Sequence, residues 1–190
     1  MILASASPRR RDLLSEAGFK LTIAPADVDE TPLPGESPVE LVRRLATNKA
    51  YAAYKTLQEL PEGEVVLGAD TIVWTPQKAL GKPLDAADAR RMLSELSGAT
   101  HHVSTGVCLI ADTSSGVVTR SFVETTDVSF RKLSEAEIDA YVKTGEPLDK
   151  AGAYGIQGGA GAFVDHICGD YNNVVGLPVE RVVRELTAIS

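Results

Sequence analysis

The sequence has few of the residues that mark disulfide-rich, zinc-binding or membrane proteins. Only two of its 190 residues are cysteine and three are histidine, and aromatic residues make up 5%. No apolar run approaches the ~20 residues that a membrane-spanning helix needs. These scarcities argue against a disulfide scaffold, a zinc site and a membrane protein. We therefore expect a cytoplasmic protein in which Cys108 and Cys168 stay reduced, with Cys108 in the core.

Positive charge is also in short supply. The chain has 19 lysine and arginine residues against 26 aspartate and glutamate residues, a formal net charge of -7. A protein with this balance repels nucleic acids and anionic membranes, so we expect no stable nucleic-acid complex and no membrane binding. Any phosphate-binding site must be a local cluster of cations. The hydrophobic fraction of 44% is ordinary for a globular protein, and the chain is long enough to bury a core.

Strand and helix patterns alternate along the chain. The patterns predict strands over residues 2–4, 21–24, 65–74, 103–110, 117–130 and 162–168. They predict helices over residues 8–17, 38–57, 85–96, 134–143 and 179–187, with capping boxes at Ser37 and Ser134. A turn over Thr113–Gly116 predicts a hairpin, and residues 25–37 form a loop. We expect one α/β domain over residues 1–190, with a mixed central β-sheet flanked by helices.

The segment Ser5-Ala6-Ser7-Pro8-Arg9-Arg10-Arg11 follows a predicted strand and opens a predicted helix. Free backbone amides and the helix dipole favour an anion at such a position, and arginine matches phosphate oxygens with a planar fork. The plainer alternative is a capped helix with a solvated basic face. Three cations at a helix N-terminus oppose the dipole, so the pattern favours an anion site.

Asp70 is a carboxylate inside the apolar strand Val65–Trp74. A charge in such a strand is expected to be partly buried, which is costly unless a cation or a metal compensates it. Gly68, two residues earlier, leaves room for a ligand or for a neighbouring backbone to approach. The alternative is a structural aspartate bonded to nearby amides, but the pattern favours a site.

Three further charged residues are candidates for the same site. Lys49 shares a helical face with apolar residues, so its ammonium either extends to solvent or meets an anion in a cleft. Lys82 follows the Asp70 strand in the turn Gly81-Lys82-Pro83, where an ordinary exposed lysine is the alternative. Glu30 lies in an acidic loop, and together with Asp70 it could hold Mg²⁺, which prefers one or two carboxylates plus phosphates and waters.

A glycine-rich block, Gly145-Glu146-Pro147-Leu148-Asp149-Lys150-Ala151-Gly152-Ala153-Tyr154-Gly155-Ile156-Gln157-Gly158-Gly159, closes the set of motifs. Glycine lets backbone amides approach a phosphate or a base edge closely. The block contains neither a Walker A motif nor GxGxxG before a helix. Its glycines and polar side chains still indicate contact with a nucleotide's phosphates or base.

Six segments together resemble the Maf family of nucleoside triphosphate pyrophosphatases, also called septum-formation-inhibitor-like proteins. They are Leu3-Ala4-Ser5-Ala6-Ser7-Pro8-Arg9-Arg10, Leu45-Ala46-Thr47-Asn48-Lys49-Ala50, Gly68-Ala69-Asp70-Thr71-Ile72-Val73, Gly81-Lys82-Pro83, the glycine-rich block from Gly145, and Val174-Val175-Gly176-Leu177-Pro178. They span nearly the whole chain in the family's order. The segment from Asp149 to Gly158 is similar to the branch that acts on dTTP and UTP.

The resemblance implies two lobes around a nucleotide-binding cleft, as in inosine triphosphatases, and hydrolysis of the α–β phosphoanhydride of dTTP and UTP. It implies Asp70 as the proton acceptor, with Glu30, Lys49 and Lys82 as further catalytic residues. Substrate contacts fall on Ser5, Ser7, Arg9, Arg10, Thr71 and Gln157, and a divalent metal cation, Mg²⁺ or Mn²⁺, falls on Asp70 and Glu30. A homodimer is also implied.

Two other functions remain open at this stage. A non-catalytic nucleotide- or nucleic-acid-binding regulator of cell division and septum formation would explain the arginines and glycines. It would not explain carboxylates beside an anion site, because these repel phosphate unless a metal intervenes. The second alternative is a pyrophosphatase that acts on modified pyrimidine triphosphates, which the sequence does not rank against dTTP and UTP.

Overall fold

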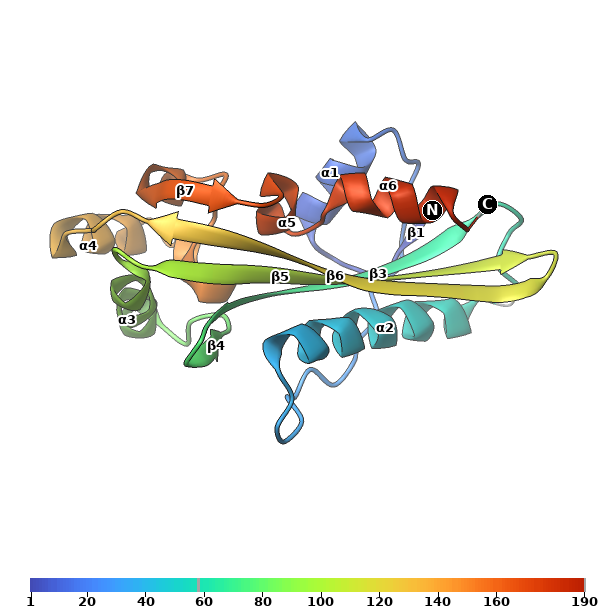
Figure 1. Ribbon diagram of the computed structural model, residues 1–190, viewed down its shortest axis with the longest axis horizontal. Coiled ribbons are helices and arrows are strands. Elements are labelled where there is room, and N and C mark those ends of the chain that lie inside the picture. Colours follow the sequence, from blue (N-terminus) through green and yellow to red (C-terminus); the bar gives the residue numbers. More distant parts are fainter. Residues whose placement is uncertain (58, 190) are drawn as a thin grey trace. The chain divides into compact units, whose positions relative to one another are not determined.

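The computed structural model describes residues 1–57 and 59–189 and has the expected α/β class (Figure 1). Ser190, the last residue of the predicted domain, lies outside this range. In the described part, seven strands form one mixed sheet and six α-helices accompany it. The strands are β1 (Ile2–Leu3), β2 (Thr22–Ile23), β3 (Val65–Thr75), β4 (Lys78–Leu80), β5 (Thr100–Thr113), β6 (Gly116–Phe130) and β7 (Val164–Cys168). The helices are α1 (Pro8–Glu16), α2 (Pro38–Thr56), α3 (Ala86–Leu96), α4 (Glu135–Lys143), α5 (Tyr171–Val175) and α6 (Val179–Thr187).

The sheet contains both parallel and antiparallel pairs. Its order is β2-β1-β3-β5-β6-β7, with β4 paired to β3 outside this path. β1 is parallel to both β2 and β3, whereas β4 is antiparallel to β3 and β7 is antiparallel to β6. β5 and β6 are neighbours joined by the predicted turn, where the Thr113 hydroxyl donates to the Gly116 carbonyl at 2.9 Å. The predicted mixed sheet and hairpin are confirmed.

The described chain divides into two compact units. Among the described residues, unit 1 comprises 1–57, 59–70, 105–124 and 176–189, and unit 2 comprises 71–104 and 125–175. Unit 1 therefore holds β1, β2, α1, α2 and α6, and unit 2 holds β4, β7, α3, α4 and α5. Strands β3, β5 and β6 run through both units.

Helix α2 packs very closely on the sheet in unit 1. A methyl group on Gly68 of β3 would overlap the Ala46 carbonyl oxygen, and one on Gly106 of β5 would overlap the Val42 carbonyl oxygen. The sequence left open whether a ligand or a backbone approaches Gly68, and the structure shows that it is the α2 backbone. The close approach is lined by small and apolar residues: Ile2, Ala4, Ala46, Ala50, Ala53, Leu60, Val66, Cys108 and Ile110.

The helix starts follow their predicted capping residues. The Ser7 hydroxyl accepts from the Arg10 amide, and Pro8 occupies the first turn of α1. Ser37 and Ser134 each form a complete capping box with the glutamate three residues later. These bonds satisfy donors that a helix N-terminus leaves unpaired, so each helix begins where the sequence predicts it.

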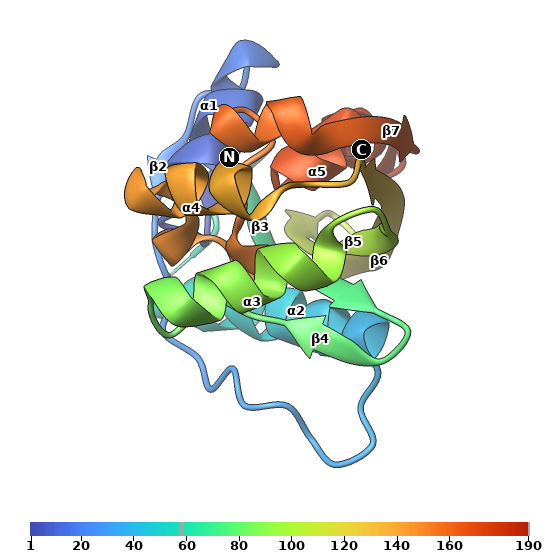
Figure 2. The ribbon, with the colours of Figure 1, turned by 90° about the vertical axis from the view of Figure 1, so that its left-hand side faces the viewer.

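Unit 2 is built around a cluster of aromatic rings. His101 and Tyr154 meet edge to face at a centroid distance of 5.4 Å, and Phe130 lies 4.9 Å from Tyr154. Helices α3 and α4 pack against each other and against the turns of the glycine-rich block (Figure 2). The Gly152 amide of that block donates to the Gly81 carbonyl at 3.0 Å. The turn Gly81-Lys82-Pro83 and the glycine-rich block are thereby joined within unit 2.

The structure differs from the sequence prediction in local details. β4 was not predicted because three residues are too short for an alternating pattern. The glycine-rich block contains short 3₁₀ turns over Glu146–Asp149, Ala151–Ala153 and Gly159–Phe163, and the last of these delays the start of β7 from the predicted Ala162 to Val164. The short segment over Tyr171–Val175 is helical.

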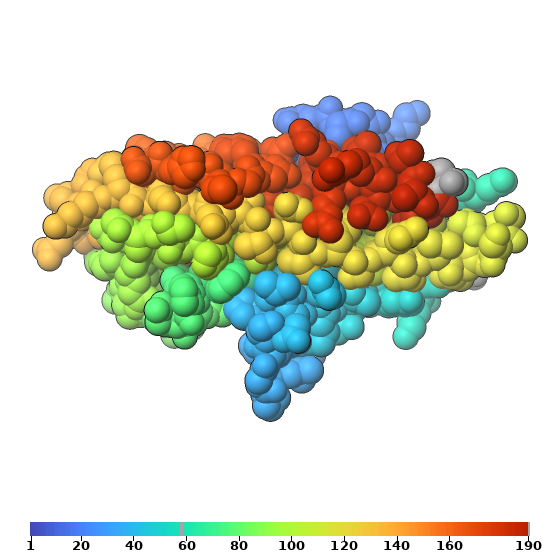
Figure 3. Space-filling view, viewed as in Figure 1, coloured from blue at the N-terminus to red at the C-terminus, as the bar shows by residue number. Residues whose placement is uncertain are grey.

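The surface of unit 1 carries the predicted acidic loop. This loop, between β2 and α2, projects beside the start of α2 and is drawn in blue in Figure 3. No helix in the described part of the chain is both long enough and apolar enough to span a membrane.

Candidate active site

Lys49 lies at the centre of a cluster of charges in unit 1. Its Nζ atom is 2.6 Å from Oδ1 of Asp70 and 2.6 Å from Oε1 of Glu30. The side chains of Lys49 and Asp70 are only 13% and 17% exposed, whereas that of Glu30 is 61% exposed. Asp70 is therefore partly buried and compensated by a cation, as predicted. Of the two alternatives for Lys49, the ammonium meets anions rather than extending to solvent.

Helix α2 and strand β3 bring this ion pair together. Lys49 stands on the face of α2 that contacts the sheet, four residues after the buried Leu45. Asp70 follows Gly68 by two residues and so shares its face of β3. Because Gly68 lets the helix backbone approach, the lysine reaches the carboxylate directly.

Arg10 is the second cation of this cluster and is almost fully buried. Its Nε donates to the Gly176 carbonyl at 3.0 Å, and its Nη1 donates to the Ser5 hydroxyl at 3.0 Å. Burial lowers the pKa of Arg10, attraction to Asp70 and Glu30 opposes this effect, and repulsion from Arg9 adds to it. A guanidinium stays charged in this environment and attracts both carboxylates, Asp70 more than Glu30.

The two serines before α1 define the turn that leads into the helix. The Ser7 amide donates to the Ser5 hydroxyl at 3.2 Å, and the Ser7 hydroxyl caps the helix. Arg9, in the first turn, is half-buried. Arg11 turns away and pairs with its neighbour Asp12 on the exposed side. Of the three arginines of this segment, Arg9 and Arg10 are therefore the two that are half-buried or buried.

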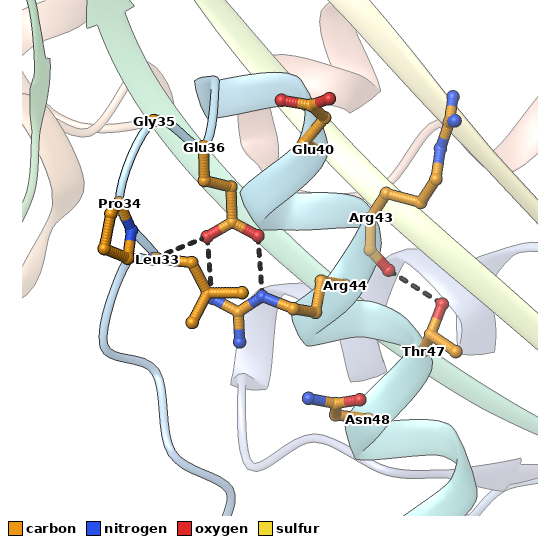
Figure 4. Close-up of a pocket in the computed structure, with 9 residues that line it drawn as sticks. All are labelled: Leu33, Pro34, Gly35, Glu36, Glu40, Arg43, Arg44, Thr47 and Asn48. Atoms are coloured by element: carbon orange, nitrogen blue, oxygen red, sulfur yellow. Dashed lines mark hydrogen bonds and ion pairs between the residues drawn. The ribbon is translucent and has the colours of Figure 1, made fainter.

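The loop that carries Glu30 is fastened to α2 by Arg44. The Arg44 guanidinium donates to Oε1 and Oε2 of Glu36 at 2.6 Å and 2.8 Å, and to the Thr31 carbonyl at 3.0 Å. This pairing lowers the pKa of Glu36 to about 2. Figure 4 shows the Arg44 guanidinium paired with the Glu36 carboxylate. Both residues line a cavity of about 570 Å³.

That cavity is distinct from the charge cluster. None of the predicted site residues lines it, because its walls are Leu33, Pro34, Gly35, Glu36, Glu40, Arg43, Arg44, Thr47 and Asn48. Its two arginines are matched by two glutamates, and one of each is already paired. We therefore assign it to the anchoring of the loop.

The remaining three predicted residues belong to unit 2. Thr71 follows Asp70 directly in β3 and is half-buried. Lys82 and Gln157 are exposed, and among the described residues the Lys82 ammonium has no ion-pair partner. The hydrogen bond between Gly152 and Gly81 ties the turn of Lys82 to the block of Gln157.

Sequence analysis missed two residues that contact the turn around Gln157. They are Tyr141 and Glu146, which hydrogen-bond to each other at 2.8 Å and to backbone amides of that turn. Glu146 stands inside the quoted glycine-rich block, and the glycines opposite it were the available signal. The expectation that Cys108 lies in the core is confirmed, and burial raises the pKa of its thiol to about 11.

The donor set near Lys49 fits a divalent cation that is completed by substrate. Among residues 1–57 and 59–189, no three His, Cys, Asp or Glu side chains group as metal ligands. Glu30 and Asp70 do converge on one cationic atom, so two carboxylates face a common point. Mg²⁺ typically uses one or two carboxylates together with phosphate oxygens and waters. Glu30 and Asp70 could therefore supply one or two oxygen ligands to a divalent cation.

This arrangement combines cations that can bind phosphate with a carboxylate that can accept a proton. Arg10 and Lys49 are held in place by hydrogen bonds and burial, so they are oriented before any ligand arrives. Phosphoryl transfer depends mostly on such positioning and on neutralising charge. The site is chemically suited to hydrolysis of a phosphoanhydride.

Comparison with known proteins agrees with this chemistry. The model of the family described as "Maf-like protein" matches residues 1–189. A dTTP/UTP pyrophosphatase of Anaeromyxobacter dehalogenans is 54% identical over 186 residues, which cover 98% of this chain and 92% of the relative. Relatives of the same name are 51% identical in Citrifermentans bemidjiense, over 100% of this chain and 95% of the relative, and in Bacillus cytotoxicus, over 97% and 93%.

The fold and the charge cluster define an α/β protein in which buried cations lie beside carboxylates. The match over residues 1–189 and the full-length relatives go further than this class. The chain belongs to the Maf-like protein family.

Proposed function

We propose that this protein hydrolyses dTTP and UTP to the monophosphate and pyrophosphate. The observation that carries the proposal is the identity of 51–54%, over nearly the full chain, to relatives named dTTP/UTP pyrophosphatase. In the reaction a water oxygen attacks the α-phosphorus, the bond to the bridging α–β oxygen breaks, and pyrophosphate leaves with the bonding electrons.

The cations of unit 1 supply the attraction for the triphosphate. A nucleoside triphosphate carries about four negative charges, and the net charge of -7 would repel it without a local positive site. We assign substrate binding to Arg9, Arg10 and the hydroxyls of Ser5 and Ser7. Lys49 also serves the phosphates, because a ligand anion can replace Glu30 on the exposed side of its ammonium.

Asp70 is the proposed general base. Lys49 fixes one of its oxygens at 2.6 Å, and the low exposure of the pair limits competing water. A carboxylate so held can accept the proton of the attacking water, provided that the water lies within hydrogen-bond reach. Asp70 would then return the proton to solvent after pyrophosphate has left.

We propose Glu30 and Asp70 as the residues that hold a divalent cation, Mg²⁺ or Mn²⁺. A bound cation would neutralise phosphate charge and acidify a bound water. Glu30 is the more exposed of the two carboxylates, and its loop is held by Arg44 one residue beyond it. The exposed Glu30 side chain can therefore turn toward a cation while its backbone and Asp70 stay in place.

The family resemblance also gives roles to three residues of unit 2. We assign Lys82 to the phosphates, and Thr71 and Gln157 to the pyrimidine. The amide of Gln157 can both donate to and accept from a base edge. Modified pyrimidine triphosphates stay candidate substrates, because nothing in these roles excludes a substituent on the base.

The remaining family properties are also proposals for this chain. They are one functional domain over residues 1–190, two lobes around a nucleotide-binding cleft, a homodimer and a cytoplasmic location. Support for them comes from the resemblance of the six sequence segments and from the match of the family model.

The direct experiment incubates purified protein with Mg²⁺ and dTTP and separates the products. We expect dTMP and pyrophosphate in equal amounts, with UTP cleaved in the same way. A product mixture of dTDP and phosphate would mean attack at the wrong phosphorus. Binding of dTTP without any cleavage would favour the non-catalytic regulator instead.

A further inference from the structure

Gln157 stands in a turn whose backbone rests on a carboxylate. The Gly158 amide donates to the Gly155 carbonyl at 3.1 Å, which closes the turn and leaves the Gln157 side chain exposed. The next amide, that of Gly159, donates to Oε2 of Glu146 at 3.2 Å. The end of the turn is thereby attached to a side chain thirteen residues earlier in the sequence.

The contact between this carboxylate and the turn leaves no space. A methyl group added to Gly158 would overlap Oε1 of Glu146, and one added to Gly155 would come within 3.2 Å of the same oxygen. The φ angle of Gly158 is -104°, which is outside the left-handed region that favours glycine. A side chain at this position would have to displace the Glu146 carboxylate from the turn.

Tyr141 joins the carboxylate to the beginning of the turn. Its hydroxyl donates to Oε1 of Glu146 at 2.8 Å and accepts from the Gly155 amide at 3.1 Å. The ring is buried and packs edge to face on Phe163 at a centroid distance of 5.2 Å. Burial raises the pKa of Tyr141, so the hydroxyl remains a donor at neutral pH.

The main chain of Glu146 is also held by hydrogen bonds. Its amide donates to the Thr144 hydroxyl at 3.2 Å, and its carbonyl accepts from Nζ of Lys150 at 3.0 Å. The pair Tyr141 and Glu146 therefore grips both ends of the turn, with Gln157 midway between them. We refer to this pair as the turn clamp.

Fixing the turn matters for how an amide recognises a base. Thymine and uracil present an N3–H donor beside the O4 acceptor, whereas cytosine presents an N3 acceptor beside an amino donor. A glutamine amide contains both a donor and an acceptor, so one that turns freely can satisfy either edge. Discrimination requires that the wrong orientation be disfavoured, and a fixed backbone limits the positions that the amide can reach.

We propose that Tyr141 and Glu146 are positioning residues that give Gln157 its preference for thymine and uracil over cytosine. This inference rests on the proposed function. The juxtaposition that carries this inference is the turn clamp on Gly155 and Gly159. Neither side chain needs to touch the nucleotide for this role.

The test measures kcat/KM for dTTP and for dCTP in Tyr141→Phe and Glu146→Gln. Tyr141→Phe removes the hydroxyl that accepts from the Gly155 amide, and Glu146→Gln replaces one of the two accepting oxygens of the clamp by an amide donor. Both substitutions keep the shape of the side chain. We expect the ratio of dTTP to dCTP activity to fall roughly fivefold in each, since one such bond contributes about 1 kcal/mol. Gly158→Ala, which pushes the turn off Glu146, is expected to lower the same ratio.

Two comparisons separate positioning from general stability. Tyr54→Phe is the matched control, because it also removes a tyrosine–carboxylate hydrogen bond, to Asp112 at 3.0 Å in unit 1. It should leave the ratio unchanged. In a Gln157→Ala background, Tyr141→Phe should lower the ratio no further, because the amide that it orients is gone.

Each alternative result has a distinct meaning. A wild-type protein that releases no pyrophosphate from dTTP would refute the proposed function and this inference with it. If the wild-type protein is active and selective, an unchanged ratio in folded Tyr141→Phe or Glu146→Gln would overturn the inference alone. An unchanged ratio in Gln157→Ala would do the same. Thermal unfolding checks that each variant is folded. If Tyr141→Phe does not fold, the ratio measured for Glu146→Gln decides the test.

Discussion

Replacing Lys49 by methionine removes the cation between Asp70 and Glu30 and keeps an apolar side chain of similar length. Both carboxylate oxygens lie 2.6 Å from the Lys49 nitrogen, so the variant leaves two like charges facing each other. We therefore predict that Lys49→Met is less stable than the wild-type protein and attracts divalent cations more strongly.

The expected loss of stability depends on how exposed the side chains of Lys49, Asp70 and Glu30 are. Breaking a fully buried ion pair costs about 3–5 kcal/mol, and breaking a surface pair costs about 0.2–1 kcal/mol. Lys49 and Asp70 are 13% and 17% exposed, so their pair lies between these limits. Because Glu30 is largely exposed, its share is small. We expect a loss of about 2 kcal/mol, or about 4–8 °C in Tm for a chain of this size.

The assay is thermal unfolding with and without Mg²⁺. Lys78→Met is the control, because Lys78 pairs with Glu95 at the surface, where the side chains are 44% and 34% exposed. Mg²⁺ should raise the Tm of Lys49→Met more than that of the wild-type protein, since the ion can occupy the place of the ammonium. A Tm for Lys49→Met no lower than that for Lys78→Met would refute the reasoning about the charge cluster.

Two further predictions concern the stability of the fold. Burial lowers the pKa of His101 from its ordinary 6.5 to about 4. The folded protein thus holds the neutral imidazole, and its contribution of about 3 kcal/mol is complete above pH 6.5 and lost as the pH falls through 4. Denaturant unfolding of His101→Gln should lack this part of the wild-type pH dependence, and parallel profiles would contradict it. Gly68→Ala should cost about 1–3 kcal/mol or more, because its methyl group meets the backbone of α2, whereas Gly81→Ala, with open space around it, should unfold near the wild-type temperature. Equal unfolding temperatures for the two variants would count against the close helix packing.

Local signals were sufficient for most of the secondary structure. The capping boxes at Ser37 and Ser134 and the turn at Thr113–Gly116 depend on neighbouring residues only, so α2 and α4 are capped, and β5 and β6 are joined, where the pattern predicts. The strand β4 was missed because Lys78–Leu80 is extended only through its pairing with β3.

The site was predictable in its residue types but not in its contacts. The sequence indicated that Asp70 needs a partner, yet only the close packing of α2 on Gly68 reveals that the partner is Lys49. The turn clamp was not predictable, because the role of Glu146 depends on amides that approach it through the folding of a glycine-rich loop.

The most direct test of the central claim compares pyrophosphate release from dTTP by the wild-type protein and by Asp70→Asn. The substitution preserves size and a hydrogen-bond acceptor for Lys49 but removes the group that takes the proton. We predict at least a hundredfold loss of kcat with a folded protein, in line with the usual contribution of a general base. Release at the wild-type rate by folded Asp70→Asn would contradict the account.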